Sequence, residues 1–172
     1  MTPKLAPIFA RRSVRRYTDQ PVADDVVQDL LEAAMAAPSA CAKDPWEFLV
    51  LRDPTRLAQV ADLLPNGPML ATAPLGFVAC GDLERAHAGE LSYLLQDCSA
   101  AIQNLLLAAS TLGLGAVWLG VHPRQERVDG LRELFQLPAS ILPISCIALG
   151  YPADTPEPRT RFNADYVHNG GW

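Results

Sequence analysis

Arginine side chains gather in one short stretch of this sequence. Arg11, Arg12, Arg15 and Arg16 lie in "RRSVRRY" (11–17), in a chain whose formal net charge is -5. Clustered cations repel one another, so the sequence predicts an anion that they hold together. The planar donor fork of Arg suits phosphate or carboxylate. A solvated basic surface is the alternative, and we prefer it for Arg16.

A second arginine pair lies near the other end of the chain. Arg159 and Arg161 alternate in "RTRF", and alternate residues of an extended segment point to the same side. Both guanidinium groups can therefore reach one anion. Twelve of the fourteen basic residues are Arg, although codon usage in a GC-rich genome would give the same bias.

The overall composition limits the classes of protein that remain. A chain of 172 residues with 49% hydrophobic and 19% charged residues fits one folded domain, residues 1–172, rather than disorder. An acidic pI near 5.1 argues against nucleic-acid binding. No signal peptide or membrane-spanning segment is recognisable, so we expect a cytoplasmic protein that does not enter a membrane.

The sequence contains no pattern typical of hydrolytic or metal chemistry. His87, His122 and His168 lie far apart, and neither H-x-x-x-H nor G-x-S-x-G occurs. The four cysteines form no C-x-x-C pair, so we expect no metal and reduced, mostly buried thiols, with Cys41 as an inert loop thiol. Either the protein is not an enzyme, or a cofactor carries the chemistry.

Helical and strand patterns alternate along the chain. An amphipathic helix is expected within 22–38, with Val26, Leu30, Leu31 and Ala34 on one stripe. Further helices are expected at 53–64, 90–115 and 126–138, the last weakened by Gly130. Strands are expected at 46–51, 73–80, 116–120 and 141–152. The helix at 90–115 is apolar nearly all round after residue 98, which predicts a central helix or a subunit contact.

Five strings in this order resemble the FMN-dependent nitroreductase family. They are "RRSVRRYTDQPV", "LLEAAMAAPSACAKDPWEFLVL", "GLGAVWLG", "IALGYP" and "PRTRF", and they extend over nearly the whole chain. The resemblance implies an α+β fold, with a mixed β-sheet flanked by helices. It also implies an intertwined homodimer with FMN at the subunit interface.

The same resemblance assigns the FMN-binding residues. It implies that Arg11, Arg12, Ser13 and Arg15 contact the FMN, and that Arg159 and Arg161 complete the phosphate clamp. The string "VWLG" matches the loop whose backbone approaches flavin N5, which gives Leu119 and Gly120. The loop formed by Pro38, Ser39 and Ala40 would reach the FMN from the partner subunit. The flavin carries the chemistry, so no side chain is assigned a catalytic role.

Two positions depart from the family pattern. The family usually reads P-S-x-x-N-x-Q-P-W, whereas this chain reads "PSACAKDPW", with Ala42 and Asp44 in place of Asn and Gln. The first change removes a polar anchor and the second adds an acid. The arginine clamp is unaffected, but the loop and the choice of substrate are expected to differ.

If the family mechanism holds, NADH or NADPH reduces the flavin and a small-molecule oxidant, a nitroaromatic or quinone, reoxidises it in ping-pong order. Alternatives are an FMN-binding protein without turnover, a dimeric interaction module without FMN, and specialised flavin chemistry. The extension 152–172 is expected to wrap the partner subunit, with Phe162, Tyr166 and Trp172 as anchors, or else to fold on its own subunit.

Overall fold

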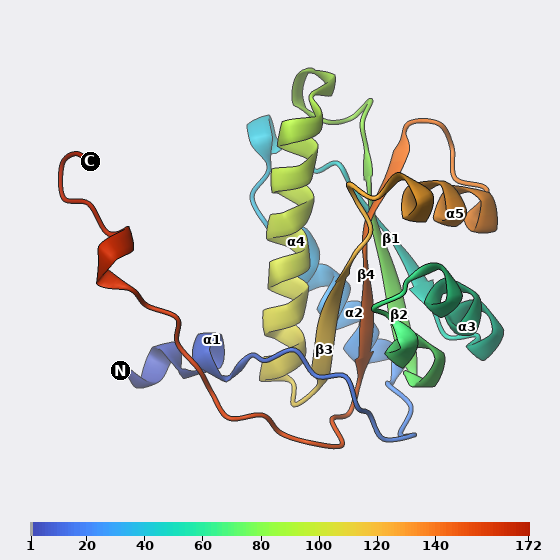
Figure 1. The fold of residues 1–172 in the computed structure, drawn as a ribbon, viewed down its shortest axis with the longest axis horizontal. Helices are drawn as coiled ribbons and strands as arrows, with labels where there is room; N and C mark the ends of the chain where they lie inside the picture. The colour runs from blue at the N-terminus through green and yellow to red at the C-terminus, as the bar shows by residue number, and fades with distance from the viewer. Residues whose placement is uncertain (1) are drawn as a thin grey trace.

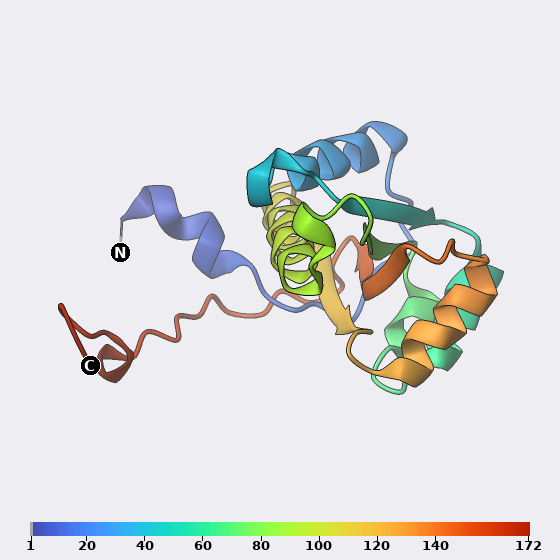
Figure 2. The same ribbon diagram turned by 90° about the horizontal axis from the view of Figure 1, so that it is seen from above.

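The computed structural model of the protein, which describes residues 2–172, has three layers. Its central sheet contains β1 (Trp46–Leu51), β2 (Leu75–Asp82), β3 (Gly115–Gly120) and β4 (Ile141–Gly150) in the order β1-β2-β4-β3. Neighbouring strands pair antiparallel. Helices cover both faces (Figures 1 and 2), which confirms the α+β class. Parallel pairing within the described chain is limited to a single bridge, between Ser13 and Ala116.

Each face of the sheet is covered by a different pair of helices. On one face lie α2 (Asp24–Met35) and α4 (Leu91–Thr111), and on the other α3 (Pro54–Leu63) and α5 (Gln125–Phe135). Successive side chains of β4 therefore enter two cores. Ile147 and Leu149 pack toward α2 and α4, whereas Cys146 and Ala148 pack toward α3 and α5. A strand buried on both faces reads as a continuous apolar run, as 141–152 does.

The expected helices and strands form, with small differences at their ends. The stripe of α2 is corrected by one position: Val27, Leu30 and Ala34 are buried, while Val26 and Leu31 are half-buried at its margin. A short N-terminal helix, α1 (Ala6–Ala10), was not expected. Gly130 has a packing role in α5, because a Cβ there would lie 2.8 Å from Leu63 Cδ2 on α3.

The chain beyond β4 extends away from the layered body. Together with α1 it projects from one side of the molecule, so that both termini lie there (Figures 1 and 2). The expected anchors Phe162, Tyr166 and Trp172 are 77%, 81% and 105% exposed. These side chains therefore do not pack on the layered body of their own protomer, and the ring of Trp172 lies against that of His168 within the extension.

Two kinds of feature are absent from residues 2–172. None of the helices there has the length and apolar character needed to cross a bilayer. Nor do three or more His, Cys, Asp or Glu side chains gather there as a metal ion would require.

Candidate functional site

The segment 11–17 is fixed along the free edge of β3. Val14 is buried and its N–H donates to Ala116 O at 3.0 Å. The close approach requires a glycine at 115, because a Cβ there would lie 2.7 Å from Val14 Cβ. Tyr17 fixes the far end of the segment: its hydroxyl lies 2.7 Å from Val14 O and 3.0 Å from Ala148 O. Burial raises the pKa of Tyr17, so the hydroxyl remains a donor.

The tail returns antiparallel beside this segment. Pro152 bridges to Tyr17, and the N–H of Ala153 donates to Arg16 O at 3.0 Å. Further along, the Arg12 guanidinium donates to Glu157 O. The N–H of Arg159 then donates to Phe9 O at 3.2 Å. This pairing carries the C-terminal arginines back to the N-terminal ones.

Four arginines from the two ends of the chain line one small pocket. Its volume is about 150 Å³, and its lining residues are Ile8, Arg11, Arg12, Arg159 and Arg161. Within residues 2–172, only Arg12 among these arginines donates a side-chain hydrogen bond, and none forms an ion pair. The pocket thus offers several charge-assisted donors to one anion, as the terminal phosphate of FMN requires. We name it the arginine pocket.

Three other residues of segment 11–17 lie outside the arginine pocket. Ser13 follows Arg12 in the sequence and is exposed. Its backbone bridges to Ala116, which places it on the edge of β3 beside the arginine pocket. Arg15 is exposed and does not line the pocket. Arg16 lies 3.6 Å from Asp154 in an exposed ion pair, in agreement with its interpretation as a surface residue.

The edge of β3 directs the N–H of Gly120 outward. Val121 N–H donates to Ile144 O on β4. In an antiparallel ladder, successive residues of a strand direct their backbone N–H and carbonyl groups alternately toward the paired strand and away from it. Leu119 therefore pairs with β4, and its side chain is 2% exposed in the core. Gly120, at the next position, faces the free edge with both its N–H and its carbonyl.

Arg127 on α5 fixes that outward carbonyl. Its Nη1 donates to Gly120 O at 2.7 Å, while its Nε is buried without a partner among the described residues. Gly120 is four residues from Ala116, or about 13 Å along a strand. Because Ala116 bridges to Ser13, Gly120 lies further along the edge of β3 than residues 11–13 do. Sequence reasoning missed Arg127, because only the tertiary structure returns α5 to β3.

The loop after α2 lies near the opposite end of α4. Asp97, in the second turn of α4, accepts the N–H of Ala40 at 2.9 Å. Arg12, by contrast, lines a neighbouring pocket with Ser110, near the end of α4. Thirteen helical residues, about 20 Å, separate Asp97 and Ser110. Figure 1 shows the loop beside the start of α4 and α1 beside its end.

Within this loop, Ser39 and Asp44 close the chain on itself. The Ser39 hydroxyl donates to Asp44 Oδ1 and accepts the N–H of Asp44 at 3.0 Å. The acid that departs from the family pattern is therefore paired inside the loop. Pro38 is exposed, while Ser39 and Ala40 are half-buried. The exposed Cys41 lies 4.0 Å from His87 Nε2.

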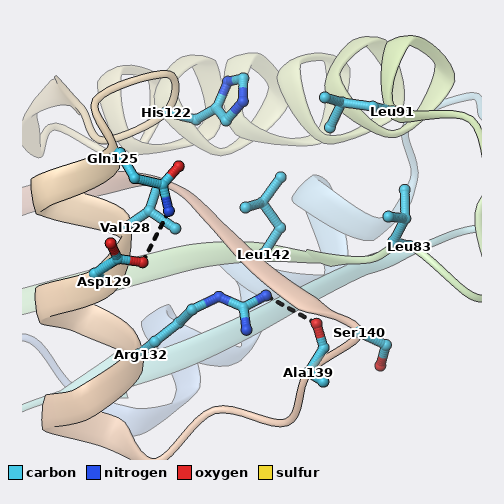
Figure 3. Close-up of a pocket in the computed structure, with 10 residues that line it drawn as sticks. All are labelled: Leu83, Leu91, His122, Gln125, Val128, Asp129, Arg132, Ala139, Ser140 and Leu142. Atoms are coloured by element: carbon cyan, nitrogen blue, oxygen red, sulfur yellow. Dashed lines mark hydrogen bonds between the residues drawn. The ribbon is translucent and has the colours of Figure 1, made fainter.

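A larger pocket of 420 Å³ lies between α5, the start of β4 and the start of α4 (Figure 3). It contains none of the expected site residues. Gln125 donates to Asp129 Oδ1, and Arg132 donates to Ala139 O, each at 2.8 Å. These pairings use several of its polar groups, whereas the guanidinium groups of the arginine pocket are largely unpaired. The arginine pocket is therefore the better anion site.

Comparisons with known proteins show the family and the fold of this chain. The sequence profile of the nitroreductase family matches residues 8–64 and 54–151. A protein of Methanothermobacter thermautotrophicus named "Putative NADH dehydrogenase/NAD(P)H nitroreductase" is 43% identical over 170 residues, which are 98% of this chain and 87% of that protein.

Two solved structures are similar over the whole chain. One is a protein of the same name from Parabacteroides distasonis, with a TM-score of 0.93, 39% identity and full coverage of both chains. The other is a nitroreductase from Desulfovibrio desulfuricans in complex with FMN, with a TM-score of 0.85 and 34% identity, covering 100% of this chain and 99% of that one. By its sequence and its fold, this chain belongs to the nitroreductase family.

Proposed function

We propose that this protein is an FMN-dependent oxidoreductase that takes hydride from NAD(P)H and passes electrons to a nitroaromatic, a quinone or a similar acceptor. The observation that carries the proposal is the arginine pocket, which brings Arg11, Arg12, Arg159 and Arg161 together in a chain of this family. A relative in the same fold has been solved with FMN bound.

The residues present fit FMN at both of its ends. Arg11 and Arg161 provide charge-assisted donors for a phosphate, with Arg12 and Arg159 beside them. At the other end, Gly120 lets the backbone approach a planar ring, because it has no Cβ and the space into which a Cβ would project is open. Its outward N–H is the donor that we assign to flavin N5.

When bound, FMN supplies the redox chemistry, accepting hydride from NAD(P)H and giving electrons to the oxidant in ping-pong order. The protein contributes binding and orientation. A fixed cation on the pyrimidine side of the ring would stabilise negative charge there, and Arg12 and Arg15 are the candidates for that role. Arg12 also lines the arginine pocket, whereas Arg15 is exposed outside it.

We further propose that the site is completed by a second copy of the chain. Loop 38–40 and the arginine pocket lie near opposite ends of α4, so the loop is assigned to the FMN held by the partner. The exposed aromatic side chains Phe162, Tyr166 and Trp172 fit an extension that packs on that partner.

An anaerobic absorption titration tests the proposal. Flavin bands should appear on adding FMN and bleach on adding NADH or NADPH. Bands that persist with both donors would favour a non-catalytic FMN-binding protein. The absence of any bound flavin would contradict the proposal at its central point.

The same titration with variants tests the pocket. Arg161→Ala should weaken FMN binding about tenfold to a hundredfold, because a hydrogen bond to a charged group contributes about 1.5–3 kcal/mol. Arg16→Ala, in the same segment but in an exposed ion pair with Asp154, is the matched control and should change the dissociation constant little. Equal effects of the two substitutions would argue for a diffuse basic surface.

A further inference from the structure

Asp97 is a buried acid that the proposed chemistry does not use. Its side chain is 5% exposed, in a stretch of α4 whose other buried residues are apolar. Oδ1 accepts one hydrogen bond, and Oδ2 is buried with no partner in residues 2–172. A carboxylate removed from water with so few partners costs stability. If this position served packing alone, a small apolar residue would stabilise the fold more than Asp97 does.

The single hydrogen bond of Asp97 goes to an unusual loop. Cys41, Ala42 and Asp44 have φ angles of 51°, 50° and 47°, in the left-handed region that residues other than glycine rarely adopt. Such a conformation persists only where surrounding contacts enforce it. The Ser39–Asp44 pair closes the loop internally, and Asp97 ties its Ala40 N–H to α4.

We propose that Asp97 is a positioning residue that sets the backbone of Pro38, Ser39 and Ala40 for contact with the flavin of the partner copy. This inference rests on the proposed function. Asp97 acts through Ala40 and does not touch the cofactor. Its effect should therefore appear in how the flavin is held and reduced, beyond any effect on stability.

A matched control lies on the same helix. Asn104 Nδ2 donates to Ala33 O on α2 at 3.1 Å, which is also a bond from an α4 side chain to a backbone atom. It does not involve the loop. Asp97→Ala and Asn104→Ala each remove one such bond. A fall in melting temperature that both variants share therefore measures the contribution of such a bond to stability alone.

The flavin readouts separate the two roles. We expect Asp97→Ala to weaken FMN binding at least tenfold and to change the visible circular dichroism of the bound flavin. Asp97→Asn, which keeps an acceptor for Ala40 N–H, should recover most of both. Asn104→Ala should match the wild type in both. Wild-type flavin properties in Asp97→Ala, or identical changes in Asn104→Ala, would overturn the proposal.

Mixed dimers test whether the loop acts across the interface. In a co-expressed dimer of Asp97→Ala with Arg161→Ala, one site would carry both defects and the other neither. We expect about half of the sites to bind FMN with wild-type affinity. If the loop acted within its own subunit, every site would be defective, and the cross-subunit part of the proposal would be wrong.

A measurement without FMN separates this inference from the proposed function. The exposed Cys41 thiol follows Ala40 directly, so its rate of reaction with a disulfide reagent reports on the loop. Asp97→Ala should change that rate severalfold and Asn104→Ala should not. If the wild type bound no FMN, the proposed function and the flavin role of Asp97 would both be wrong. The reaction rate of Cys41 would still show whether Asp97 anchors the loop to α4.

Discussion

At the scale of single residues, the site depends on side chains that fix backbone groups. Arg127 holds the carbonyl of Gly120, and Asp97 holds the amide of Ala40. Sequence reasoning assigned neither residue to the site. Asp97 is the one acid within α4 (Leu91–Thr111), which was a signal, but no sequence feature identified the atom that it binds. Arg127 resembled any exposed helix residue until α5 was placed beside β3.

Arg127 provides a prediction at this scale. Arg127→Ala removes the donor to Gly120 O, so the edge of β3 is less well fixed at the position assigned to flavin N5. We expect the bound flavin to be reduced by NADH about tenfold more slowly, as measured by anaerobic stopped-flow absorbance. Arg132→Ala removes a similar bond from α5, to Ala139 O, and should leave the rate unchanged. Equal rates in the two variants would contradict the role of Arg127.

At the scale of elements, the site is formed where two irregular segments run along the edge of a regular sheet. Segment 11–17 follows β3, and the tail from 152 to 159 returns beside it. Neither segment is a strand of the sheet, so no periodic pattern indicated how they pair. The alternation of Arg159 and Arg161 predicted that both face one side, but the tail pairing determines which side.

A substitution at Tyr17 tests how much its hydroxyl bonds stabilise segment 11–17 against β3 and β4. Tyr17→Phe leaves Ala148 O, in the buried strand β4, without the hydroxyl donor. We expect the free energy of unfolding to fall by roughly 1–2 kcal/mol in urea denaturation, with weaker FMN binding. Tyr151→Phe is the control, since the hydroxyl of Tyr151 makes no hydrogen bond within residues 2–172. A loss of stability as large in the control would show that the hydroxyl bonds of Tyr17 are not its cause.

At the scale of the whole molecule, three thiols are enclosed by the layers. Burial raises the pKa of Cys80 and of Cys98 to about 12, and it also raises the pKa of Cys146. Cys41 is exposed. The expectation of mostly buried thiols is thus confirmed. The layers that bury them also keep them protonated above pH 9, where a solvent-exposed thiol would ionise.

The raised pKa values of these thiols predict that the folded protein loses stability at alkaline pH. Their pKa values in the folded protein exceed the ordinary thiol value of 9.0, so above pH 9 the unfolded chain releases protons that the folded chain retains. The free energy of unfolding should therefore fall between pH 9 and 12, by at most about 1.4 kcal/mol per pH unit for each thiol. Urea denaturation at several pH values measures this slope. Cys98→Ala should make it shallower and Cys41→Ser should not, whereas a slope unchanged in Cys98→Ala would exclude the thiol as a source.

The sequence by itself determined the four strands, the helices α2 to α5 and the α+β class, and it singled out the arginines that the arginine pocket brings together. Apolar periodicity and turn residues act locally, and the five family strings lie in order along the chain. Only the tertiary structure decided that Arg15 lies outside the pocket and that Gly120 rather than Leu119 turns its N–H outward. It alone showed that Arg127 holds the carbonyl of Gly120 and that Asp97 holds the amide of Ala40. These outcomes depend on strand register and on the return of distant segments, which no local pattern encodes.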